Sequence, residues 1–80
     1  MNKNKLTEAC GLYGVVALLG AYALVSFGVI GSDSILFQAL NISGGVGIVV
    51  DALAQKNWQP AVLNIVWAII GLIALVNILL

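Results

Sequence analysis

Three amide side chains in the long apolar runs of this sequence are candidates for chemistry: Gln38, Asn41 and Asn64. A fourth amide, Asn77, lies near the far end of the last run and points elsewhere. An amide surrounded by hydrocarbon needs a hydrogen-bond partner, so each of the three should face another helix or a wet cavity. Gln38 and Asn41 are three residues apart, a spacing that places both on one face of a helix. These uncharged groups donate and accept hydrogen bonds, so the chemistry that they could support is the binding of a polar molecule.

Two interpretations of these amides stay open. In the first, they bond to one another across helices and only fix the helix register. In the second, they line a cavity for a small neutral polar solute, and nearby aromatic rings form its walls. The residues predicted to bind this solute are Asn64, Asn41, Trp67, Gln38 and Tyr22.

Catalytic chemistry is not expected. The sequence has no histidine, no cluster of metal ligands, and no nucleophile placed beside a base. Asp33 and Asp51 stand at the ends of apolar runs, where carboxylates reach lipid headgroups, although Asp51 lies near the face of Gln38 and Asn41 and is the better candidate of the two for a functional role. Cys10 is the only cysteine, which excludes an internal disulfide. We predict no enzyme activity, no metal and no cofactor.

The composition indicates that lipid surrounds most of this chain. Its 80 residues are 62% hydrophobic and 8% charged, with a mean hydropathy of +1.16. A soluble chain this short could not bury that much apolar surface. The formal net charge is zero, and no cluster of cations exists to contact phosphates, so nucleic acid is not an expected partner.

The apolar runs predict an all-α membrane protein with three transmembrane helices in a single domain, residues 1–80. The helices are expected at about 9–30, 34–54 and 60–80. Pro60 should occupy the first position of the last helix, where a missing N–H costs no hydrogen bond.

Turn residues separate these helices. Gly31 suits the end of the first helix, and Ser32 or Asp33 suits the cap of the second. Thr7 with Glu8 suits the start of the first helix, where negative charge is favoured by the helix dipole.

Small residues recur at helical spacing and predict where the helices pack. Close backbone approach at small residues is the usual basis of helix contact in membranes. The first helix carries such a stripe, which Gly28 extends, and the second contains a glycine pair. The predicted packing residues are Gly14, Ala17, Ala21, Gly44, Gly45 and Gly71.

The lysines predict an orientation. Three spans place the N-terminal segment and the second loop on one side of the membrane, and Lys3, Lys5 and Lys56 all lie there. Lysine and arginine are enriched in cytoplasmic loops. The N-terminus is therefore expected to be cytoplasmic.

Several stretches resemble a family of small uncharacterised bacterial inner-membrane proteins, over most of the chain from Gly14 to Gly71. The stretches are residues 21–26, 34–41, the Gly44-Gly45 pair, and Pro60 with residues 63–67. This resemblance implies a location in the bacterial inner (plasma) membrane.

More distantly, the chain is similar to the bacterial half-transporters called SemiSWEETs, of the PQ-loop kind. Their substrate-contacting asparagine, early in the third helix, matches Asn64. This resemblance implies a parallel homodimer around a sugar-sized cavity, with the third helix packed between the first and second. A homodimer also follows from the amides, because three helices alone would leave two polar stripes facing lipid. The alternative is a structural or regulatory small membrane protein that transports nothing.

Overall fold

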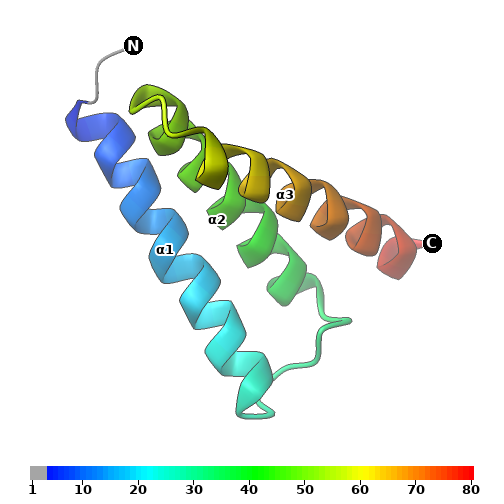
Figure 1. Cartoon of the computed structure of the whole chain (residues 1–80). Coiled ribbons are helices and arrows are strands. Elements are labelled where there is room, and N and C mark those ends of the chain that lie inside the picture. The colour runs from blue at the N-terminus through cyan, green and yellow to red at the C-terminus, as the bar shows by residue number, and fades with distance from the viewer. Residues whose placement is uncertain (1–3) are drawn as a thin grey trace.

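The computed structural model describes residues 4–80 as three helices (Figure 1). They are α1 (Lys5–Ser26), α2 (Ile35–Ala54) and α3 (Trp58–Leu79). Each is long and apolar enough to cross a membrane, because a helix needs about 20 mainly apolar residues to span the hydrocarbon core. The predicted all-α architecture with three membrane-spanning helices is confirmed.

Local side-chain chemistry sets both ends of α1, which begins and ends earlier than residues 9–30. Asn4 Oδ1 accepts a hydrogen bond from the Thr7 backbone N–H at 2.9 Å, and Thr7 Oγ1 accepts one from the Asn4 N–H at 3.1 Å. This reciprocal capping box starts the helix at Lys5. Gly28 has a φ of +75°, and Val29 N–H bonds back to the Leu24 carbonyl at 2.9 Å. This left-handed C-terminal motif ends the helix before Gly28, so Gly31 is not its cap.

The other helix ends differ less from expectation. Ser34 caps α2, since its Oγ accepts from the Phe37 N–H at 3.0 Å. Just after the C-terminal end of α2, Lys56 adopts a φ of 55°, a conformation that residues other than glycine rarely adopt. Helix α3 begins at Trp58, two residues earlier than predicted, so Pro60 occupies its third position. The cost of proline stays small there because the first turn has no intrahelical partners for its N–H groups.

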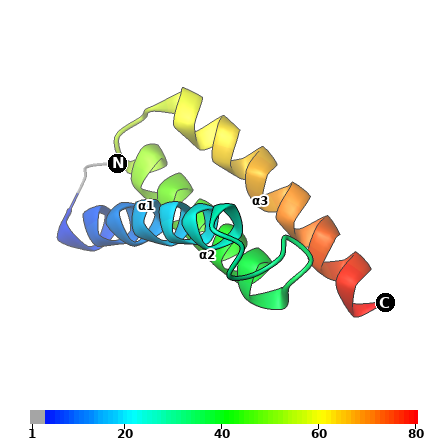
Figure 2. The same cartoon turned by 90° about the horizontal axis from the view of Figure 1, so that it is seen from below.

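Helix α2 lies between the other two (Figures 1 and 2). It packs against both α1 and α3, whereas α1 and α3 do not pack against each other within residues 4–80. The third helix is therefore not the central one, contrary to what the SemiSWEET resemblance implies. The reason lies in α2 itself, which carries glycines on two faces: Gly44 and Gly47 face α1, and Gly45 faces α3.

The core consists of small side chains. No large side chain is fully buried among the described residues, and the buried apolar side chains are all alanines. Leucine, isoleucine and valine side chains mostly point outward, as expected when lipid is the surrounding solvent. The buried apolar and glycine positions are Gly11, Gly14, Ala17, Ala21, Gly44, Gly45, Gly47, Ala52, Ala54, Ala61 and Gly71.

Candidate functional site

The three predicted amides all point inward. Gln38 and Asn41 on α2 are each 7% exposed, and Asn64 on α3 is 6% exposed. The chain's own helices provide this shielding. The expectation that these amides would face lipid in a lone subunit is wrong, because α2 packs its polar face against α3. Burial of the amides therefore requires no second copy, and the homodimer remains a prediction.

Asn64 makes a hydrogen bond within its own helix. Its Nδ2 donates to the carbonyl oxygen of Pro60, one turn earlier, at 2.9 Å. The backbone at Asn64 packs against α2, since a Cβ built on Gly45 would lie 3.5 Å from the Asn64 carbonyl oxygen. Asn64 lines neither of the cavities described below. These contacts indicate that Asn64 contributes to the packing of α3 against α2.

Gln38 has one end tied and the other end available. Its Nε2 donates to the carbonyl oxygen of Ser32 at 2.9 Å, which fastens the loop between α1 and α2 to the start of α2. Its Oε1 lies beside α3, because a Cβ built on Gly71 would meet it at 3.4 Å. No residue within 4–80 donates to this oxygen, so it is left as an acceptor beside a cavity.

Asn41 differs from the other two amides. Its side chain forms no hydrogen bond with any other described residue, although it is more than nine-tenths buried. Buried polar side chains nearly always have a partner, and an orphaned one costs about 1–3 kcal/mol. Asn41 lines two adjoining cavities. Its amide therefore faces space that another molecule can fill.

The two cavities form one groove along α2. The first, of about 290 Å³, lies between α2 and α3, and the second, of about 240 Å³, also reaches α1. They share Phe37, Asn41 and Trp67. We call their combined lining the amide groove: Leu18, Leu19 and Tyr22 of α1; Phe37, Gln38 and Asn41 of α2; Trp67, Ile70, Gly71 and Ala74 of α3.

The lining of the amide groove is uncharged, and it is mainly apolar apart from the amides of Gln38 and Asn41. It contains no lysine, arginine, aspartate or glutamate. The two aromatic walls are accessible, since Tyr22 is 71% and Trp67 is 46% exposed. Neither the Tyr22 hydroxyl nor the Trp67 indole N–H bonds to another residue within 4–80. Four of the five predicted binding residues thus come together, and Asn64 is the exception.

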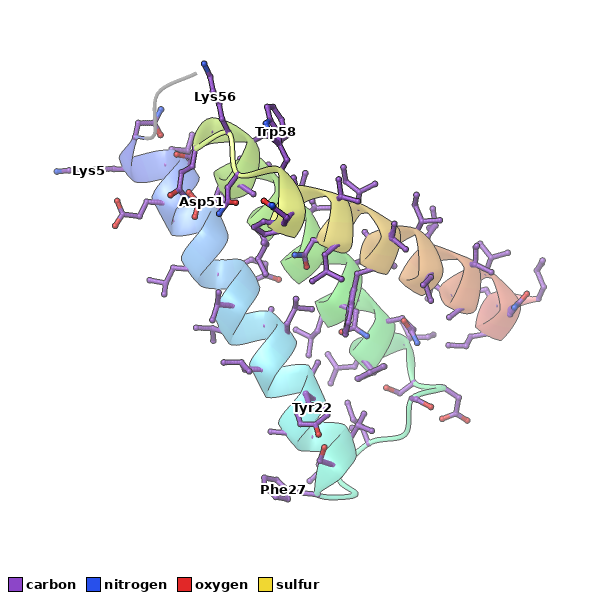
Figure 3. All side chains as sticks on the ribbon, viewed as in Figure 1. Lys5, Tyr22, Phe27, Asp51, Lys56 and Trp58 are labelled. Carbon is purple, nitrogen blue, oxygen red and sulfur yellow. The ribbon has the colours of Figure 1, made fainter. Side chains whose placement is uncertain are left out.

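The charged residues Lys5, Asp51 and Lys56 lie away from the groove. Figure 3 shows Lys5, Asp51, Lys56 and Trp58 at one end of the molecule, and Tyr22 and Phe27 at the other. The Asp51 carboxylate packs against Gly11 of α1, which leaves no room for a Cβ there. Asp51 lines neither part of the groove, so its proximity to the face of Gln38 and Asn41 in sequence does not bring it to the cavity.

Sequence reasoning missed one polar contact between helices. The Tyr13 hydroxyl lies 2.7 Å from Ser43 Oγ, and Ser43 in turn donates to the Ala39 carbonyl oxygen at 2.8 Å. The bond joins α1 to α2 on a face that is exposed to the surroundings of the bundle. No spacing rule identifies partners 30 residues apart before the helix pairing and register are known.

Residues 7–80 match the model of a family of small, uncharacterised proteins. The chain belongs to this family. The match covers all three helices except the first two residues of α1. Comparisons with curated proteins and with solved structures gave no significant match. Family membership and the three apolar helices together indicate a small membrane protein, and the link to SemiSWEETs is not shown.

Proposed function

We propose that this protein binds a small, uncharged polar molecule in the amide groove and is not an enzyme. The single observation that supports this is Asn41, a buried amide without a hydrogen-bond partner in the described chain that lines both parts of the groove. A primary amide supplies two donors and an acceptor. Gln38 Oε1 supplies a second acceptor beside it, and Trp67 and Tyr22 supply flat walls.

The size and charge of the groove restrict the ligand. Binding pockets for small molecules usually measure roughly 300–1,000 Å³, and the two parts of this groove measure about 290 and 240 Å³. An ion would lack a counter-charge in a lining of amide, aromatic and aliphatic groups, and burial of an unpaired charge is strongly unfavourable. A neutral molecule with one or two hydrogen-bonding groups fits these surroundings best.

Transport is a stronger form of the same proposal. A groove that is open at its side must be closed before a polar solute can cross the hydrocarbon core, and a second copy of the chain would close it. The half-transporter is therefore proposed as a homodimer, with the accessible walls Tyr22 and Trp67 at the contact. We propose the bacterial inner membrane as its location. Lys5 and Lys56 lie at the same end as Trp58 (Figure 3), which supports the orientation with this end cytoplasmic.

Uptake into proteoliposomes tests the proposal. Purified protein is reconstituted, and entry of radiolabelled glycerol, erythritol and glucose is measured against protein-free vesicles. We expect uptake of glycerol, which has the fewest hydroxyls of the three, to exceed uptake of glucose, and to be lost in Asn41→Leu and retained in Asn77→Leu, since Asn77 is an exposed amide outside the groove. Equal uptake by the wild type and Asn41→Leu would show that Asn41 does not bind the solute.

A structural role without transport is the second candidate, and specific contacts favour it. Asn64 bonds to Pro60, Gln38 bonds to Ser32, and Tyr13 bonds to Ser43, so most polar groups in the bundle stabilise the chain itself. This candidate predicts that Asn41→Leu changes neither solute binding nor flux. The oligomeric state in lipid separates it further, because a structural protein requires no dimer across the groove.

A further inference from the structure

The depth of Asn41 in the bundle limits where a ligand comes from. Asn41 follows the N-cap Ser34 by seven residues, which at 1.5 Å per residue places it about 10 Å along α2. The hydrocarbon core is about 30 Å thick, so this amide lies well below the headgroups, beside acyl chains. A ligand group at Asn41 must therefore reach into the hydrocarbon region.

The walls of the groove favour a hydrocarbon neighbour over a fully polar one. Apart from Asn41 and Gln38, the lining is aromatic, aliphatic or glycine, and Tyr22 and Trp67 leave it accessible from outside the bundle. A sugar such as glucose would bring more hydroxyl and ether oxygens than the polar groups of the lining that are free within residues 4–80, which are the Asn41 amide, Gln38 Oε1, the Tyr22 hydroxyl and the Trp67 indole N–H. Each hydroxyl without a partner at this depth costs several kcal/mol.

We infer that the ligand is an uncharged amphiphile whose single hydroxyl or carbonyl binds the Asn41 amide, and whose hydrocarbon tail lies along the groove beside Trp67. This inference rests on the proposed function and specifies its ligand class. It also explains how the groove is reached, since an amphiphile moves sideways from the surrounding bilayer. The uncharged lining matches an uncharged head.

Tryptophan quenching by brominated amphiphiles tests this inference. The full chain carries two tryptophans, so Trp58→Phe leaves Trp67 as the only indole. This protein is reconstituted in phosphatidylcholine vesicles and titrated with dibrominated octadecanol, or with dibrominated octadecane, which has the same tail and no hydroxyl. Bromine quenches an indole only in contact, so quenching reports a tail that lies beside Trp67.

We expect saturable quenching of Trp67 by the alcohol and weak, linear quenching by the alkane. On this background, Asn41→Leu should raise the alcohol concentration for half-quenching about fivefold, the effect of losing one hydrogen bond of typical strength. Asn77→Leu, an equal amide-to-leucine change outside the groove, should leave the titration unchanged. Circular dichroism of each variant confirms that the helices are intact.

Two results would overturn the inference. Identical, unsaturable quenching by alcohol and alkane would show that Trp67 meets bulk lipid and that no head group is recognised. Asn41-dependent uptake of glycerol, erythritol or glucose without saturable quenching would retain the proposed function and replace the amphiphile by a water-soluble solute. Failure of both the uptake and the quenching experiments would remove the proposed function as well.

Discussion

The two faces of α2 form interfaces of different kinds. Toward α1, backbone meets backbone: a Cβ on Gly14 would run into the Gly44 carbonyl oxygen, and one on Gly47 into the Cys10 carbonyl oxygen. Toward α3, the approach is looser, and a Cβ on Gly45 would meet its nearest atom at an ordinary 3.5 Å. The first interface is closed, whereas the second contains the amides and most of the groove.

This difference shows how a single helix can serve stability and binding at once. Membrane helices associate mainly through van der Waals packing, which improves as their backbones approach. The α1–α2 interface reaches that limit at Gly14 and Gly47, where the facing backbone leaves no room for a Cβ atom. At the α2–α3 interface, larger side chains lie between the two helices and leave a cavity of about 290 Å³. The closed interface therefore holds α2 in place, while the open one leaves space for the proposed ligand.

The largest predicted effect comes from a side chain forced into the closed interface. Gly14→Val should lower the free energy of unfolding by about 3 kcal/mol, because its branched side chain would overlap the α2 backbone, which has no flexible end to move aside. Unfolding in mixed micelles with increasing dodecyl sulfate, followed by circular dichroism, measures this change.

Gly20→Val is the matched control for that variant. Gly20 is in the same helix, and a Cβ there meets nothing within 4 Å. Its free energy of unfolding should change by no more than about 0.5 kcal/mol. Equal losses in the two variants would show that contact between backbones does not explain the effect, since helix propensity alone favours valine over glycine.

A second comparison tests the two faces of α2 at Gly45 and Gly47, which are close in sequence and face different helices. Gly47→Ala should destabilise the protein by about 1–3 kcal/mol, since its methyl group would meet the Cys10 carbonyl oxygen. Gly45→Ala should be neutral or slightly stabilising, because the methyl group fits against α3 and alanine favours a helix by up to about 1 kcal/mol. The same micelle titration applies, and the reverse ranking would contradict the assignment of closed and open interfaces.

Sequence reasoning predicted the helices better than their ends or their order. Hydropathy and length are summed over about 20 residues, so three spans were predictable with only local errors. The ends depend on single hydrogen bonds, such as the Asn4–Thr7 capping box and the left-handed Gly28, which average composition does not reveal. The order in space depends on which faces pair, and glycines on both faces of α2 decided it.

The candidate site was predictable as a set of residue types and only in part as an arrangement. Spacing correctly placed Gln38 and Asn41 on one face, because a shared helix fixes their relation. It could not distinguish the amide that bonds locally from the amide that does not. Asn64 bonds to Pro60 in its own helix, whereas Asn41 bonds to no described residue, and this difference depends on rotamers and neighbours.

Asn41 and Asn64 provide a third comparison, in which the expected changes in stability are smaller. Asn41→Leu should leave stability unchanged or raise it by up to about 1 kcal/mol, because it replaces an amide without a partner by an apolar side chain of similar size. Asn64→Leu should lower stability by about 0.6 kcal/mol, the mean for polar side-chain bonds in a membrane protein. Unfolding in ligand-free micelles measures both, and a marked loss in Asn41→Leu would show that this amide has a structural partner.

An effect as small as that of Asn64→Leu is predicted for the polar bond that reinforces the closed interface. Tyr13→Phe removes the contact of 2.7 Å with Ser43 and leaves the ring in place, so stability should fall by about 0.6 kcal/mol. Tyr22→Phe is the control, because the Tyr22 hydroxyl bonds to no described residue and its loss should not change the unfolding free energy. A double-mutant cycle with Ser43→Ala isolates the pair. A coupling energy near zero would show that this hydroxyl pair does not stabilise the contact between α1 and α2, and the glycine contacts would then explain the stability of the closed interface better than this polar bond.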